Sequence, residues 1–172
     1  FAVGRAGSRM FLDWCRRHQV SCTNNQVDIG VRVELPAMVW EHFSSRVYEP
    51  KILYRSKAYG DITRMFCFNE RGQVVTENTD GVLTVNGHAY KDPQKKTQNS
   101  NFALLSTIRF TEPFRDPIDY ARDVASLANK ISGGSVLVQR LGDLEKGRRT
   151  DEKRLWASTV QPTLKAVPGD LS

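Results

Sequence analysis

Apolar and polar residues alternate along residues 27–35 and predict a β-strand with one buried face. The apolar side chains at positions 29, 31, 33 and 35 would face the core, while Gly30, Arg32 and Glu34 would lie on the opposite face. If that face is open to water, Arg32 is an ordinary surface charge without a functional role. If the face is covered, the guanidinium needs an anionic partner.

Helical spacing of apolar residues predicts two main helices. The first covers residues 8–19, and apolar residues at positions 10, 11, 14 and 15 share one side of it. Asp116 and Pro117 suit the N-cap and the first turn of the second helix, whose apolar residues recur as far as Ile131. A shorter helix is expected from Pro36 to about Phe43.

The middle of the chain predicts a series of short strands. Three of their connections, at residues 69–72, 78–81 and 86–87, begin with Asn and end with Gly, which favours hairpin turns. We therefore expect an α+β fold built on an antiparallel, strand-rich meander or barrel-like sheet with two main helices. The expected strands are residues 51–57, 62–68, 73–77, 82–85, 88–90, 101–110 and 136–139, with loop and one helical turn near Leu155 following Leu141.

Composition and charge narrow the functional classes. The chain of 172 residues suits one globular domain or one with a small satellite, and no apolar run is long enough to span a membrane. The net charge of +6 suggests nucleic acid, but the basic residues 140–154 are mixed with four acidic ones and are typical of a solvated surface. Three unevenly spaced Cys and scattered His predict a reduced, cytoplasmic protein without a metal site.

The first candidate site is the glycine turn before the first helix. Gly4 and Gly7 would let the backbone approach a cofactor, Arg5 would add a positive charge, and the helix beginning at Ser8 would favour an anion. The alternative is a tight strand-to-helix turn in which Ser8 is the N-cap. The pattern alone leaves both readings open.

Further candidates lie in the strand-rich middle. Cys67 is either a substrate-side thiol, and so the candidate catalytic residue, or a small core residue between two Phe. Asn86, Gly87 and His88 either place an imidazole at a hairpin tip or simply form the turn. Asn69 is expected mainly to form a turn. Asn99 and Asn101 could face a ligand or cap the backbone at a strand entrance.

Several blocks of sequence together resemble one family. They are GRAGSRMFLDW, VDIGVRVELP, MFCFNERGQVV, VNGHAY and NSNFALL, in this order. They are similar to landmarks of the bacterial FAD-dependent dehydrogenases, which are large cytoplasmic flavoproteins, mostly uncharacterised oxidoreductases. The resemblance covers most of the chain, from Ala2 to about Phe110, and continues more loosely through VLVQRLGDL and RRT to PGDLS.

The resemblance implies an inserted, substrate-side domain of a Rossmann-type flavoprotein. Residues 1–20 would border the FAD domain, 21–140 would form the inserted domain, and 141–172 would lead back to the FAD domain. Gly4, Arg5, Gly7 and Ser8 would lie near FAD, and Arg32, Cys67, Asn69, Asn86, Gly87 and His88 would lie on the substrate side. The FAD fingerprint would lie outside this chain, so the chain alone would be inactive and its partner would be the FAD domain of the same polypeptide.

Two other classes of function remain open at the level of sequence. A basic RNA-binding module would use Arg16, Arg17, Arg148 and Arg149, but no RNA-binding motif accompanies them. A structural or dimerisation domain would need no ligand.

Overall fold

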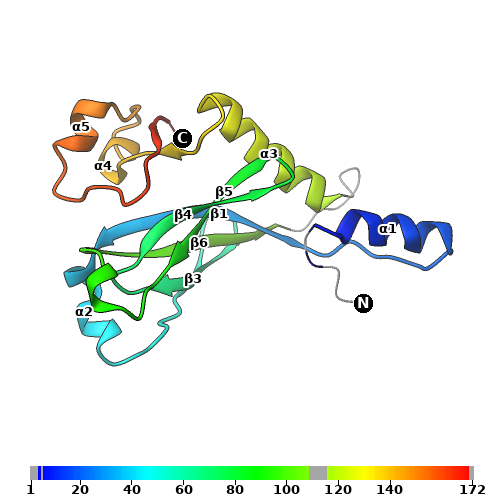
Figure 1. The fold of residues 1–172 in the computed structure, drawn as a ribbon, viewed down its shortest axis with the longest axis horizontal. Coiled ribbons are helices and arrows are strands. Elements are labelled where there is room, and N and C mark those ends of the chain that lie inside the picture. Colours follow the sequence, from blue (N-terminus) through cyan, green and yellow to red (C-terminus); the bar gives the residue numbers. More distant parts are fainter. Residues whose placement is uncertain (1–3, 5, 109–115, 171–172) are drawn as a thin grey trace.

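The structure of the protein, a computed structural model, describes residues 4, 6–108 and 116–170 (Figure 1). It has an α+β fold, as predicted, whose main sheet is antiparallel and contains four strands in the order β1-β6-β3-β2. These strands are β1 (Val27–Pro36), β6 (Asn99–Ile108), β3 (Ile62–Asn69) and β2 (Leu53–Arg55).

One face of the main sheet carries the apolar core. β1 and β6 pair along their whole length, from Val27 opposite Ile108 to Pro36 opposite Asn99. Because residues opposite each other share a face, Val33 and Phe102 lie on the same side. Helix α2 (Ala37–Ser44) covers this side through Trp40. The cluster consists of Met65, Phe68 and Phe102, with Val33, Leu35, Trp40 and Leu104 packed against it.

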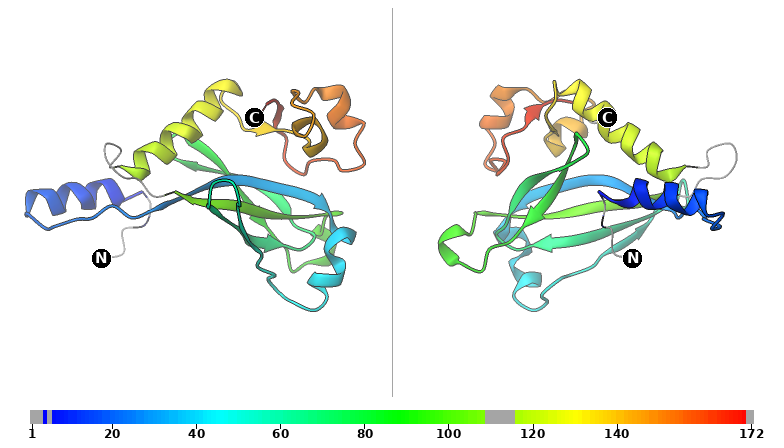
Figure 2. Two further views of the ribbon diagram at one scale, coloured as in Figure 1. Left: turned by 180° about the vertical axis from the view of Figure 1, so that it is seen from behind. Right: turned by 45° about the vertical axis from the view of Figure 1, so that its right-hand side comes forward.

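The opposite face of the sheet carries the polar residues of β1 and is covered by a hairpin. Strands β4 (Gln73–Thr79) and β5 (Val82–His88) form this hairpin as a separate two-stranded sheet. Figure 2 shows the hairpin beside the main sheet, with helix α3 (Pro117–Ile131) next to it. The Asn129 side chain fixes α3 to β5, since it accepts from Leu83 N at 2.8 Å and donates to Leu83 O at 3.0 Å.

The two ends of the described chain extend from this central body. Helix α1 (Ser8–Arg17) projects beyond the end of the sheet in both Figure 1 and Figure 2. The C-terminal part contains only short elements, and its two strands pair in parallel. These elements are β7 (Leu137–Val138), α4 (Leu141–Leu144), α5 (Glu152–Trp156) and β8 (Val167–Pro168); a 3₁₀ turn, η1 (Pro93–Lys95), precedes β6.

Two features of the predicted sheet are wrong. In the described residues the main sheet is open and not barrel-like, with β1 and β2 as its edges. The strands also do not form a meander, because β3 pairs with β6 and the β4–β5 hairpin leaves the sheet. The departure follows a bulge in β3 and a left-handed Arg71 (φ 46°) in the next turn, which together redirect the chain.

The three predicted turns have different outcomes. The turn at residues 69–72 is present but joins β3 to β4, which do not pair, so it is not a hairpin. Asp80 and Gly81 have φ values of 51° and 81°, as a two-residue hairpin turn requires, and join β4 to β5. Asn86 and Gly87, in contrast, lie inside β5, where Gly87 pairs with Val74. Residues 88–90 accordingly form no further strand, and part of the strand expected at 101–110 lies outside the described residues.

The two main helices were predicted correctly, and Asp116 caps α3 by accepting from the backbone N–H groups of Ile118 and Asp119. Helix α4 was not predicted.

Among the described residues, no helix combines the length and apolar character needed to cross a bilayer.

Candidate functional site

A group of polar residues gathers where the β4–β5 hairpin meets the main sheet. We call it the Arg32 cluster; it consists of Arg32, Cys67, Asn69, Gly87 and Asn101, contributed by β1, β3, β5 and β6. The register explains the meeting. Asn101 lies opposite both Glu34 of β1 and Asn69 of β3, so these side chains share the face that the hairpin covers.

The guanidinium of Arg32 is held by two neutral oxygens. Its Nε and Nη2 donate to Asn101 Oδ1 at 2.9 and 2.6 Å, and Nη2 also donates to the carbonyl oxygen of Cys67 at 2.9 Å. Asn69 Nδ2 donates to the same carbonyl at 2.8 Å and lies 3.7 Å from Cys67 Sγ. The Cys67 carbonyl therefore joins Arg32 to Asn69.

Cys67 reaches this position through an unusual backbone. Its φ of +52° is left-handed, and the pairing of β3 with β6 shifts register between Phe66 and Asn69. A residue with a Cβ costs roughly 1–2 kcal/mol in this region. Such strain persists where the surrounding structure requires it, often at binding sites. Here the bulge turns the carbonyl of Cys67 toward Arg32.

The charge of Arg32 is not balanced by a carboxylate within the described part of the chain. The side chain is half-buried, and burial lowers the pKa of Arg32, an effect partly offset by its contact with Cys67. Arginine stays protonated in proteins, so the positive charge remains. A partly desolvated cation that contacts only neutral acceptors is a favourable place for an anionic or carbonyl oxygen.

Asn101 carries an unused donor beside this cation. The residue is 0% exposed, and its Nδ2 has no hydrogen-bond partner among the described residues. Exchanging the amide O and N would not help, because Oδ1 already accepts twice from Arg32. A buried orphan donor is costly and rare in folded proteins. Among the described residues, the cluster thus holds a cation without a carboxylate partner and a donor without an acceptor.

Gly87 allows the hairpin backbone to lie directly on the cluster. A Cβ at this position would lie 1.7 Å from Arg32 Nη2, 2.3 Å from Asn101 Oδ1 and 2.4 Å from Asn69 Nδ2. No side chain fits there without moving all three groups. Close approach, and not a turn, is the reason for glycine at this position.

A second polar group, the Asp143 cluster, consists of Asp143, Arg148, Thr150 and Arg154. Asp143 is 1% exposed and accepts from Arg148 Nε at 2.7 Å, Thr150 Oγ1 at 3.0 Å and Arg154 Nε at 3.3 Å. Burial raises the pKa of Asp143, but the hydrogen bonds from Arg148, Thr150 and Arg154 outweigh it and lower the pKa to about 2. The prediction of a solvated surface over residues 140–154 is therefore wrong at Asp143.

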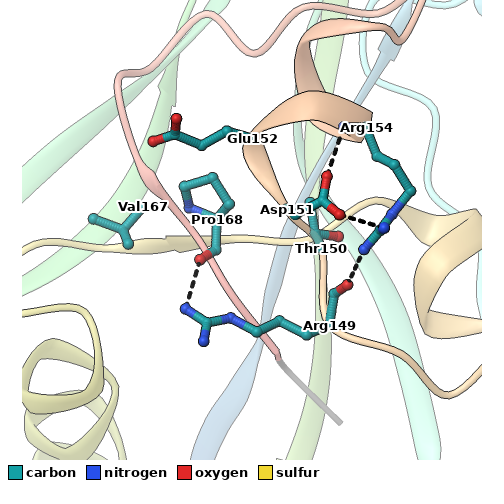
Figure 3. A pocket seen from close by; sticks show the side chains of 7 residues that line it. All are labelled: Arg149, Thr150, Asp151, Glu152, Arg154, Val167 and Pro168. Atoms are coloured by element: carbon teal, nitrogen blue, oxygen red, sulfur yellow. Dashed lines mark hydrogen bonds and ion pairs between the residues drawn. The ribbon is translucent and has the colours of Figure 1, made fainter.

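A shallow groove of about 490 Å³ lies beside this second cluster (Figure 3). Figure 3 shows Arg154 bonded to Asp151 and to the carbonyl of Arg149, and the Arg149 side chain bonded to the carbonyl of Pro168. The groove is lined by Arg149, Thr150, Asp151, Glu152, Arg154, Val167 and Pro168. The bonds that Arg149 and Arg154 make to neighbouring groups indicate a structural role for these two side chains.

The structure brings together four of the residues proposed from sequence: Arg32, Cys67, Asn69 and Gly87. It places two others elsewhere. Asn86 Nδ2 donates to Glu77 Oε1 at 2.7 Å within the hairpin, and the exposed His88 packs against the Tyr90 ring at 4.5 Å.

The glycine turn does not join the cluster. Gly4 has a left-handed φ of 62°, Gly7 is the N-cap of α1 and Ser8 begins the helix, but none of these contacts Arg32; Arg5 lies outside the described residues. Ser8 is thus not the N-cap of α1.

Sequence reasoning gave too little weight to Asn101. Its signal is the run Asn99-Ser100-Asn101 at the start of an apolar strand, since all three residues are buried, at 7%, 1% and 0% exposure. Three buried polar residues in succession require partners. Among the described residues, no three His, Cys, Asp or Glu side chains gather as metal ligands would.

Comparison with known proteins adds no relative: no family model matches the chain, and neither does any curated protein.

Proposed function

We propose that this chain is the substrate-side domain of an FAD-dependent oxidoreductase, with the Arg32 cluster directed at the reacting part of the flavin and its substrate. FAD would bind mainly to a second domain of the same polypeptide. When bound, FAD supplies the group that accepts or gives hydride, while the protein supplies orientation and hydrogen bonds.

One observation carries the proposal. Four of the sequence blocks that resemble the flavoprotein family each contribute to the same cluster in space. VDIGVRVELP contains Arg32, MFCFNERGQVV contains Cys67 and Asn69, VNGHAY contains Gly87, and NSNFALL contains Asn101. The resemblance rests on the order of these blocks along the chain, so their convergence is an independent observation.

The chemistry of the cluster suits this role. Arg32 brings a positive charge without a carboxylate from the described residues, and Asn101 Nδ2 is a buried donor without an acceptor. The half-buried Arg32 would be satisfied by an acceptor oxygen, such as a ring carbonyl of a flavin or the carboxylate of a substrate, whereas the fully buried Asn101 Nδ2 would reach one only if the β4–β5 hairpin moved aside. A hydrogen bond of this kind, in which one partner is charged, contributes about 1.5–3 kcal/mol.

The surface of α3 is consistent with a neighbouring domain. The helix contacts β5, to which the Asn129 side chain fixes it, whereas larger apolar side chains recur at three- and four-residue spacing along its exposed surface. These exposed side chains are Tyr120, Val124, Leu127 and Ile131. An apolar stripe of this kind is typical of a surface that another part of a protein covers.

The proposal is tested by measuring flavin in two proteins. The protein expressed from the complete reading frame should purify with about one FAD per chain, measured by absorbance and by chromatography of the released cofactor. The 172-residue chain should purify without it. Absence of flavin from the first protein would contradict the proposed function, and stoichiometric FAD on the second would contradict the assignment of the cofactor to another domain.

A further inference from the structure

The face of the main sheet that carries Arg32 continues beyond the hairpin. Arg32 lies opposite Ala103 of β6, which in turn lies opposite Phe66 of β3. Because residues opposite each other share a face, Phe66 is on the same face as Arg32, with the two Cα atoms roughly 10 Å apart, or two strand spacings. Phe66 is 40% exposed, so this part of the face is open to solvent.

Apolar side chains extend this face toward the β2 edge of the sheet. Ile62 alternates with Arg64 and Phe66 along β3 and therefore points to the same side. Leu53 of β2 lies opposite Arg64 and shares that side as well. Ile62 and Leu53 are 41% and 71% exposed. We call Leu53, Ile62 and Phe66 the apolar tract; neighbouring exposed apolar side chains of this kind are typical of a binding surface.

The charges beside the apolar tract are positive. Lys51 Nζ and Arg64 Cζ lie 5.9 and 5.0 Å from the centre of the Phe66 ring. Arg64 is balanced by Asp28, whereas the exposed Lys51 has only a long contact of 3.9 Å with Glu49. The surroundings of the tract therefore favour a ligand that is apolar along its body and negatively charged at an end.

One end of the Arg32 guanidinium is available for that negative charge. Its Nε and Nη2 donate to Asn101 and Cys67, whereas Nη1 donates to no acceptor among the described residues. A carboxylate suits this donor, since it carries one negative charge and accepts short hydrogen bonds from a guanidinium. A single arginine matches a monocarboxylate in charge.

We propose that the substrate of this site is an amphipathic monocarboxylate, whose acid group binds Arg32 Nη1 and whose apolar chain or ring lies on the apolar tract. The inference rests on the proposed function, because it names the substrate class for the same site. A short acid such as acetate would reach Arg32 alone. An acid with an extended chain, such as octanoate, would reach both Arg32 and Phe66.

The test measures dissociation constants by calorimetry on the complete protein, with acetate, octanoate and the neutral octanamide as probes. Octanoate should bind at least about tenfold more tightly than acetate, because its additional methylene groups leave water. It should also bind about tenfold more tightly than octanamide, since only the acid makes a hydrogen bond in which both partners are charged. Calorimetry needs no flavin signal, so binding is measured whether or not FAD is present.

Variants assign the two halves of the ligand to the two parts of the surface. R32M should weaken octanoate about tenfold and leave octanamide unchanged, whereas F66A should weaken octanoate and leave acetate unchanged. L53S, at the more exposed end of the tract, should act in the same direction and covers the case in which F66A does not fold. The control is Y54A, because Tyr54 is exposed but lies opposite Thr63, on the other face of the sheet.

Several outcomes would overturn the proposal. They are equal affinities for octanoate and acetate, tighter binding of inorganic phosphate than of octanoate, or octanoate binding that R32M and L53S leave unchanged. A second copy of the chain on this face would also overturn it, and would appear as a dimer that L53S dissociates and that does not bind octanoate.

The flavin content of the same preparation separates this inference from the proposed function. Protein that contains FAD but does not bind octanoate would contradict only the substrate class. Flavin-free protein that binds octanoate through Arg32 would contradict the proposed function and support the site for an amphipathic acid.

Discussion

The Arg32 cluster and the Asp143 cluster each hold a charge by hydrogen bonds, half-buried at Arg32 and fully buried at Asp143, yet the two charges differ in how completely they are satisfied. Asp143 is surrounded by two guanidinium groups and a hydroxyl, so its charge is balanced. Arg32 has only two neutral acceptors, and its neighbour Asn101 keeps a buried donor unused.

The difference separates a structural role from a binding role. A fully satisfied charge fixes the local fold and has no capacity left for a ligand. An unsatisfied charge and donor raise the free energy of the folded chain and are retained where a ligand completes them. On this account, Asp143 stabilises the C-terminal part, and Arg32 is available to bind an acceptor from outside the described residues.

The largest effect on folding should come from D143N. The substitution removes a carboxylate that three groups contact, and at neutral pH it should lower the urea midpoint of unfolding more than any other substitution considered. E145Q, at an exposed carboxylate two residues further on, is the control and should leave the midpoint unchanged. If D143N matches E145Q, Asp143 is not the structural centre of this region.

The loss of stability caused by D143N should also depend on pH. The folded pKa of about 2 lies below the ordinary value of 3.8, so the carboxylate contributes its full stability above pH 3.8 and loses it as pH falls toward 2. The difference in urea midpoint between wild type and D143N should therefore shrink across this window. A difference that is constant with pH would contradict the assigned ion pairs.

A smaller effect on stability is expected from G87A. The added methyl group would displace Arg32, Asn69 and Asn101 together, and overpacking of this kind costs about 1–3 kcal/mol in the free energy of unfolding. The matched control is G142A next to Asp143, because a Cβ there meets nothing within 4 Å. Chemical denaturation measures both. Equal effects of the two substitutions would mean that the hairpin does not lie on the Arg32 cluster as described.

The smallest of these effects on stability is expected from E34Q. Glu34 links β1, the strand that carries Arg32, to the C-terminal part, which carries Asp143. Glu34 accepts from Asn99 Nδ2 at 3.0 Å and from the backbone N of Thr163 at 3.1 Å. Loss of its charge should cost about 1 kcal/mol in the free energy of unfolding, less than a whole hydrogen bond to a charged group contributes, because the amide oxygen still accepts. The amide of Thr163 should exchange faster with deuterium, whereas E41Q, at the exposed Glu41, should not change it. Unchanged exchange in E34Q would show that the C-terminal part is held elsewhere.

Local signals predicted the elements well. The alternation around Arg32, the Asp116 cap of α3 and the Asn78–Gly81 turn all reflect interactions between residues close in sequence. Strand order was not predictable in this way, because the pairing of β3 with β6 depends on a bulge at Cys67 that no sequence pattern marks. At Gly87 the local hairpin preference is overridden by contact with residues distant in sequence, the farthest being Arg32, 55 positions away.

The candidate site was predictable only in part, for the same reason. An arginine within an apolar strand indicated Arg32, but its partner Asn101 is 69 residues away. The mixed charges of residues 140–154 were compatible with a solvated loop or with a buried network. Which of these forms depends on whether Arg148 and Arg154 fold back onto one carboxylate, and composition does not contain that information.

The most direct test of the central claim is the midpoint potential of the bound flavin in the complete protein, measured for R32M and R64M. Arg64 is on the same face of the sheet but pairs with Asp28, so its charge is already balanced. Loss of the Arg32 charge should lower the potential by about 30–60 mV, the equivalent of one charged hydrogen bond for a two-electron couple. R64M should leave the potential at the wild-type value. Equal potentials in R32M, R64M and wild type would contradict the claim that the Arg32 cluster faces the flavin.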